Sequence, residues 1–439
     1  MYHAQAMQTS LSLFPAIALT LLLGACGRSN VVPDGTGLCP ELACDPYRDT
    51  QAIAATGHPD VLYATDRRPA DPLDANTGFY LNRRGGALRL GVATLRLSRP
   101  DASPTWADAQ RVPLLRDQYE DYPLQISAVR EFGIEPASVS PLAPRELHER
   151  ADARALEAFA DAVNARMAAS DRRDVTVFVH GYKISFATPL LLAAELSHYL
   201  NHQGVVIAYA WPSQETVWGY ASDIESAVNS ARNLRLLLGA IAKYSEAERI
   251  HIVAHSAGSR LVMRALADIA LAGGREFSRS DTRIDQVILA GSDLDRDILA
   301  GYFLDGVLRI TGSLTIYASR DDGALEASET VFRRRRAGQT IAEAAIDERN
   351  AGWLLEQKRL HIVDVSDAPG WDAGRGHRYL RTSPWVRADI LTTLLQDLSP
   401  AERGLERSAA YPLWRFPPDY PRRLEPLVEA ARGRKTAPR

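Results

Sequence analysis

The chain has 439 residues, of which 46% are hydrophobic and 24% are charged, a composition typical of a globular protein with one large domain or two ordinary ones. Because 54 acidic residues nearly balance 51 basic ones, the net charge is only -3 and creates no overall field that would attract a nucleic acid. The composition therefore argues against nucleic-acid binding.

The N-terminus carries a targeting pattern. Residues 11–23 form an apolar run that is too short to cross a bilayer core of roughly 30 Å, and we interpret it as the centre of a signal peptide. The run ends in Leu23-Gly24-Ala25-Cys26, which resembles the bacterial lipobox, where the cysteine thiol accepts diacylglycerol. No Lys or Arg lies between residues 2 and 10, so a start at Met7 stays open, as does an ordinary cleaved signal with a free cysteine. We expect a lipoprotein signal peptide over 1–26, a lipid anchor on Cys26, and a location in the bacterial cell envelope, on the outer membrane facing the periplasm.

Residues 27–57 are rich in Gly, Pro and polar side chains and are predicted to form a tether. They contain Cys39 and Cys44, and export to an oxidising compartment favours a local disulfide between them. Zinc binding is the alternative, but two sulfurs without a nearby histidine fall short of a closed zinc shell.

The next segment predicts strands at 61–65 and 88–97, which we interpret as an N-terminal extension. From about residue 175, short apolar runs alternate with helical patterns. Because runs without polar alternation are typical of strands buried on both faces, we predict a doubly wound, mostly parallel α/β sheet within one domain over 58–400, followed by a C-terminal extension over 401–439. The expected strands are 175–179, 205–210, 250–254, 287–290, 314–318 and 360–365, and the expected helices are 189–200, 223–242, 259–271, 295–304 and 385–398.

A nucleophile motif lies between the predicted strand 250–254 and the helix that follows it. The sequence Ala254-His255-Ser256-Ala257-Gly258 is close to the Gly-x-Ser-x-Gly elbow, in which a sharp turn raises the serine hydroxyl above the edge of a sheet. Ala254 departs from the glycine of the motif but is small, and Gly258 matches it. The pattern predicts Ser256 as a nucleophile; a packing turn built of small residues is the alternative.

A serine nucleophile needs a base, and the order of an elbow-type triad is serine, acid, histidine. Of the ten histidines, only His361 and His377 follow Ser256. His361 lies inside a predicted strand and is interpreted as structural. His377 lies in the loop beyond that strand, where an α/β sheet gathers its catalytic groups, and is predicted to be the base.

The acid should follow the strand before that loop. The stretch Ser319 to Leu325 follows the predicted strand 314–318, and within it Asp322 stands just before a helical run, so we predict that Asp322 orients His377. Asp321 is interpreted as an exposed cap, and Asp293, at the end of the preceding strand, is the other alternative.

An oxyanion hole is expected after the strand 175–179. Gly181 allows close approach of the backbone to a substrate, and we expect the N–H groups of Tyr182 and Ala257 to be the donors. His180 and His255 are interpreted as hydrogen-bonding or packing residues of these turns rather than as bases.

Several stretches together resemble an uncharacterised bacterial α/β-hydrolase family within the esterase/lipase superfamily, whose members often begin with Tyr-Ala-Thr-(Asn/Asp)-Arg, as does Tyr63 to Arg67. The resemblance extends from about residue 60 to about residue 398 and implies an α/β-hydrolase fold and esterase activity. Matched position by position, it supports Ser256, His377, and Asp322 over Asp321. The other matching stretches are Phe178 to Tyr182, Tyr209 to Ser213, Val253 to Gly258, Asp293 to Asp297 and Ser319 to Leu325.

We therefore expect Ser256 to attack an ester carbonyl and water to resolve the acyl-enzyme, with a small-molecule or lipid-like ester as substrate and the membrane as the other contact. A catalytically inactive envelope protein that uses the scaffold for binding or assembly stays open, as does an amidase or peptidase acting on cell-wall material. The sequence has no Gly-rich phosphate loop with a lysine and no His-Glu-x-x-His, so no cofactor and no metal are expected.

Overall fold

The computed structural model describes residues 60–71, 78–97, 124–200, 202–214, 219–339, 348–370, 376–408 and 413–433. The expected signal peptide, the lipidated Cys26, the tether and the Cys39–Cys44 disulfide lie outside these residues and stay predictions. Within the described ranges, we find no helix with the length and apolar character needed to cross a membrane.

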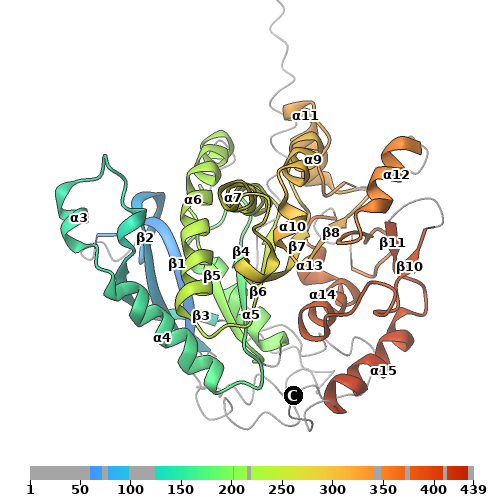
Figure 1. Ribbon diagram of the computed structural model, residues 1–439, viewed down its shortest axis with the longest axis horizontal. Coiled ribbons are helices and arrows are strands. Elements are labelled where there is room, and N and C mark those ends of the chain that lie inside the picture. Colours follow the sequence, from blue (N-terminus) through green and yellow to red (C-terminus); the bar gives the residue numbers. More distant parts are fainter. Residues whose placement is uncertain are drawn as a thin grey trace, which may run out of the picture.

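One 11-stranded sheet forms the centre of the molecule (Figure 1). Its strands are β1 (Asp60–Pro69), β2 (Tyr80–Leu97), β3 (Leu124–Ile134), β4 (Asp174–Val179), β5 (Val205–Tyr209), β6 (Arg249–His255), β7 (Ile284–Ala290), β8 (Ser313–Ala318), β9 (Leu360–Asp364), β10 (Glu406–Arg407) and β11 (Leu413–Arg415). Their order across the sheet is β10-β11-β9-β8-β7-β6-β4-β5-β1-β2-β3. From β11 to β1 in this order, neighbouring strands are parallel, whereas β10 and the β1-β2-β3 meander pair antiparallel at the two edges.

Helices cover both faces of the sheet. Side chains of α4, α6 and α7 pack on one face, and those of α5, α14 and α15 pack on the other. The described helices are α3 (Arg145–Arg150), α4 (Arg154–Ala168), α5 (Ala187–Tyr199), α6 (Tyr220–Tyr244), α7 (Gly258–Gly273), α8 (Arg279–Thr282), α9 (Arg296–Leu304), α10 (Val307–Ile310), α11 (Gly323–Phe332), α12 (Glu348–Glu356), α13 (Tyr379–Thr382), α14 (Pro384–Gln396) and α15 (Tyr420–Gly433), with the 3-10 turn η3 (Pro136–Ser138) before them.

The central strands explain the layered architecture. Every residue of β4, β5 and β7 is buried, as is expected of parallel strands covered on both faces. Successive residues of β4 therefore pack in the cores on opposite faces of the sheet. Val177 packs in the cluster that contains α6 and α7, and Phe178 packs in the cluster that contains α5 and α14. The prediction of a doubly wound, mostly parallel sheet is confirmed.

The N-terminal extension belongs to the same sheet. β1 pairs parallel with β5, with Leu62 opposite Ile207, and antiparallel with β2. β3, which the sequence pattern did not predict, forms the outer edge, where Gln125, Ser127 and Ala128 are exposed. An edge strand exposed in this way lacks the apolar pattern by which a strand is recognised.

The C-terminal extension also joins the sheet, because β11 pairs parallel with β9. A buried charge pair holds the C-terminal extension to α14. The Arg403 guanidinium donates to both oxygens of the Asp389 carboxylate on α14, at 2.7 and 3.2 Å, and both side chains are almost fully buried. The hydroxyls of Tyr317 and Tyr420 also donate to Asp389, at 2.6 and 3.3 Å. Four donors therefore hold one carboxylate between the sheet, α14 and the C-terminal segment.

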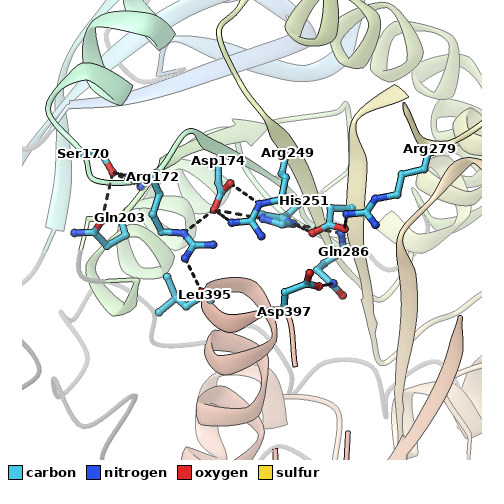
Figure 2. A network of polar contacts seen from close by, with 12 residues as sticks. Ser170, Arg172, Asp174, Gln203, Arg249, His251, Arg279, Gln286, Leu395 and Asp397 are labelled. Atoms are coloured by element: carbon cyan, nitrogen blue, oxygen red, sulfur yellow. Dashed lines mark hydrogen bonds and ion pairs between the residues drawn. The ribbon is translucent and has the colours of Figure 1, made fainter. Parts of the chain in front are cut away.

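A second charged network ties the amino ends of the central strands (Figure 2). The Asp174 carboxylate on β4 accepts hydrogen bonds from Arg172 at 2.6 Å and from Arg249 on β6 at 2.8 Å. His251 lies between two carboxylates, 3.8 Å from Asp174 and 3.9 Å from Asp285 on β7. Burial works against the charge on Asp174, but His251 and Arg249 outweigh it and hold the pKa of this carboxyl well below its usual value. The network binds strands together at the edge opposite to their carboxyl ends.

Candidate active site

The predicted site lies where the direction of winding reverses. β4 is flanked by β5 on one side and by β6 on the other, so the connections leaving β4 and β5 run to opposite sides of the sheet. Ligands of open α/β sheets bind outside the carboxyl ends of the strands at such a point. Gly181 follows β4 and Ser256 follows β6, which places both residues at this reversal.

Ser256 occupies a tight turn between β6 and α7. Its φ is +52°, a left-handed conformation that non-glycine residues rarely adopt, and its N–H donates to the Ala290 carbonyl of β7 at 2.9 Å. A Cβ on Gly258 would lie 2.4 Å from the His180 carbonyl oxygen, and a Cβ on Gly181 would lie 2.9 Å from the Ser256 Cβ. The elbow turn therefore requires glycine at position 258, and the facing loop after β4 requires glycine at position 181.

His377 and Asp322 form a buried pair. Nδ1 of His377 lies 2.7 Å from Oδ2 of Asp322; His377 is 7% exposed and Asp322 is fully buried. This bond fixes the Nδ1–H tautomer, so Nε2 is left as the proton acceptor. Burial by itself would lower the pKa of His377, but the Asp322 carboxylate outweighs burial and raises it above its ordinary value.

The two oxygens of Asp322 have different partners. While Oδ2 contacts His377, Oδ1 accepts hydrogen bonds from the N–H groups of Ala324 and Leu325, both at 3.1 Å, and so caps α11. Because the cap fixes the rotamer of the carboxylate, the start of α11 aims Asp322 at the imidazole.

The two other candidate acids have different surroundings. Asp321 is exposed, as the sequence suggested. Asp293 accepts a hydrogen bond from Ser328 at 2.5 Å and pairs with Arg260 at 3.1 Å and with the buried Arg336 at 3.6 Å. The geometry thus joins His377 to Asp322.

His377 lies beside the elbow. Its backbone carbonyl is 3.2 Å from Nε2 of His255, and the two imidazole rings have centroids 5.1 Å apart. Burial and the neighbouring His377 lower the pKa of His255 to about 3, so His255 is neutral and serves as a packing and hydrogen-bonding residue. In the described structure the Ser256 hydroxyl itself makes no hydrogen bond; without substrate, catalytic hydrogen bonds are often long and tighten only in the complex.

Tyr379 is a supporting residue that sequence reasoning missed. Its hydroxyl donates to the Tyr317 carbonyl at 2.8 Å and accepts a hydrogen bond from the N–H of Gly291. Tyr379, which is two residues after His377 in the sequence, therefore links the carboxyl ends of β7 and β8. The only signal in the sequence is its closeness to His377.

The predicted oxyanion donors belong to two segments, the loop after β4 and the start of α7. Gly181 packs against Ser256, and Ala257 is the N-cap of α7, so its N–H belongs to the unpaired first turn of that helix. Nδ1 of His180 lies 2.7 Å from the Gly181 carbonyl, which shares a peptide unit with the N–H of Tyr182. The His180 ring thereby sets the orientation of that N–H.

Trp211, two residues after β5, contacts His180. Their rings stack at 5.2 Å with an interplanar angle of 9°, and the indole Nε1 donates to the His180 carbonyl at 2.8 Å. Burial lowers the pKa of His180 well below its ordinary value, so the ring is neutral. Trp211 is fully buried, which makes it a packing residue of the loop.

In the part of the chain that the structure describes, no group of three or more His, Cys, Asp or Glu side chains has a geometry that could hold a metal ion.

Comparison with known proteins identifies the scaffold. The family model described as "Alpha/beta hydrolase of unknown function (DUF900)" matches residues 155–395. A comparison with curated proteins found no match. Among solved structures, one similar chain is titled "AbyA5 Wildtype"; it is 16% identical over 44% of this chain and 46% of its own length, with a TM-score of 0.21.

Proposed function

The chain belongs to this family of α/β-hydrolases of unknown function, and on that premise we propose that it is a serine hydrolase that cleaves carboxylic esters through Ser256, His377 and Asp322. The observation that carries the proposal is the buried bond of 2.7 Å between His377 and Asp322, next to a serine held at φ +52°. A backbone strained in this way, beside a histidine whose pKa is raised by a carboxylate, is characteristic of a functional site.

The proposed reaction follows from this geometry. Nε2 of His377 removes the hydroxyl proton of Ser256 as the oxygen attacks the ester carbonyl, and the Asp322 carboxylate stabilises the imidazolium that forms. The N–H groups of Tyr182 and Ala257 stabilise the oxyanion of the tetrahedral intermediate. His377 then returns the proton to the leaving alkoxide, and water, deprotonated by the same imidazole, hydrolyses the acyl-enzyme.

The test uses a fluorophosphonate probe, which reacts with activated serines, and p-nitrophenyl esters of short and medium chain length. We expect the purified protein to be labelled and to hydrolyse the esters, and Ser256→Ala to lose both properties while keeping its circular dichroism spectrum. Ser280→Ala, at an exposed serine on α8, is the matched control and should behave as the wild type.

A folded wild-type protein that is neither labelled nor active would overturn the proposal and favour an inactive scaffold that binds or assembles. Labelling together with turnover of p-nitroanilides in preference to esters would keep the mechanism but assign the substrate to the amide class. Both outcomes are read from the same preparation.

A further inference from the structure

A fully buried arginine lies close to the loop that carries the proposed oxyanion donor. Arg67 lies near the carboxyl end of β1, opposite Arg84 of β2 and beyond Ala64, where the pairing of β1 with β5 ends, and its side chain is 0% exposed. A buried guanidinium is stable only where its donors are satisfied. One arm donates to Asn82 Oδ1, and the other, Nη2, donates to the Ile184 carbonyl at 2.7 Å.

Ile184 belongs to the loop between β4 and α5, two residues after Tyr182. Ser213 also holds this loop: its hydroxyl accepts hydrogen bonds from the N–H of Lys183 at 2.8 Å and, more weakly, from the N–H of Ile184 at 3.4 Å. Ser213 in turn donates to Asp223 at 2.8 Å, in the first turn of α6. Lys183 has a φ of +63°, so these contacts stabilise a backbone conformation that the loop would not adopt by itself.

The residues before Arg67 anchor the strand that presents it. The Thr65 hydroxyl donates to the Ala210 carbonyl at 2.6 Å and accepts a hydrogen bond from the N–H of Arg67 at 3.2 Å. The Asp66 carboxylate accepts hydrogen bonds from Ser230 at 2.6 Å and Asn233 at 3.0 Å on α6. Three consecutive polar side chains are thus buried in a strand, and each has a defined partner just after β5, on α6, or in the loop between β4 and α5.

We infer that Arg67 is a positioning residue for ester hydrolysis: by fixing the Ile184 carbonyl, its guanidinium holds the loop so that the Tyr182 N–H faces the developing oxyanion. The inference rests on the proposed function. It also assigns a role to the Tyr-Ala-Thr-Asp-Arg motif, which lies far from Ser256 in the sequence. A bidentate fork suits the task because it bridges two fixed acceptors, which the single ammonium of a lysine cannot do with the same geometry.

The test compares Arg67→Met and Arg67→Lys with Arg403→Met, which removes another buried guanidinium at the far half of the sheet. Each protein is assayed below its unfolding temperature. Loss of one oxyanion donor lowers kcat by about 100- to 1000-fold, so we expect a loss approaching about 100-fold in kcat with little change in KM for both Arg67 variants. Arg403→Met should be less stable but should keep the wild-type kcat.

Two further measurements separate positioning from general damage. The inhibition constant of a trifluoromethyl ketone, which forms an oxyanion on Ser256, should rise in parallel with the loss in kcat/KM, whereas the pH midpoint of kcat/KM should not move. Asn82→Ala, at a partly exposed position, removes one acceptor of the fork and should give a smaller loss of the same kind, even if the Arg67 variants fold poorly.

If the wild type is active but folded Arg67 variants keep kcat within about twofold, or if Asn82→Ala leaves kcat and inhibitor affinity unchanged, the inference is overturned while the proposed function stands. A shifted pH midpoint would also overturn it, because Arg67 would then act on the charge of His377 rather than on the loop. An inactive wild type would refute the proposed function itself.

Discussion

The double use of the Asp322 carboxylate allows catalysis and stability to be separated at one position. Asp322→Asn keeps an oxygen for the N–H groups of Ala324 and Leu325 but presents an amide, without charge, to His377. Asp322→Ala removes both contacts. The two variants should therefore share a catalytic defect and differ in stability.

The magnitudes follow from the two sets of contacts. Replacing a triad aspartate by asparagine leaves the imidazole in the wrong tautomer and lowers kcat about 10,000-fold, which corresponds to about 5 kcal/mol of transition-state stabilisation. Asn and Asp are equally good N-caps, whereas alanine at an N-cap costs about 1 kcal/mol. We expect kcat to fall about 10,000-fold in both variants, and Asp322→Ala to unfold with about 1 kcal/mol less free energy than Asp322→Asn.

The assays are p-nitrophenyl ester turnover and urea unfolding followed by circular dichroism. Asp321→Asn, at the exposed neighbour, is the control and should change neither quantity. If Asp322→Asn retains more than about a tenth of the wild-type kcat, Asp322 does not orient the base. If the alanine and asparagine variants are equally stable, the cap on α11 contributes nothing.

Three more predictions follow from buried charges. Because Asp322 raises the pKa of His377 above 6.5 and the base must be neutral, kcat/KM should rise with pH through a midpoint above 6.5; a midpoint below this value would contradict the pairing. The free energy of unfolding should change with pH in the opposite direction to kcat/KM. The pair of His377 and Asp322 stabilises the fold most at low pH, and this contribution is lost as pH rises through the raised pKa of His377. Urea unfolding at several pH values measures this loss. Arg403→Met leaves the Asp389 carboxylate buried without its ionic partner and should cost about 3–5 kcal/mol in urea unfolding, whereas Arg423→Met, at a side chain 37% exposed, should cost less than about 1 kcal/mol. Equal costs would refute the argument from burial.

The sequence predicted the central part of the sheet because each of its strands is an apolar run. The expected strand 250–254 corresponds to β6, and the expected helix 259–271 corresponds to α7, with small shifts at the ends where capping decides. β3 was missed because an edge strand with exposed polar residues has no such pattern, and its pairing with β2 is interrupted by register shifts.

The residues of the candidate site also divide into those that local sequence predicts and those that it does not. Ser256 follows a strand directly, and Asp322 and His377 lie in the loops after two further strands, so local sequence was sufficient to nominate them. Arg67 could not be found like this. Its contact with Ile184 spans 117 positions and depends on the parallel pairing of β1 with β5, which no local pattern specifies.

The left-handed conformation of Ser256 sets a limit on how stable this protein can be while it keeps the proposed nucleophile. A non-glycine residue in that conformation costs about 1–3 kcal/mol, and glycine would remove the cost. Selection for stability alone would therefore favour Ser256→Gly, a substitution that deletes the hydroxyl. A serine kept at this position reflects a compromise between durability and activity, in which the two large cores of the fold tolerate a locally unfavourable backbone.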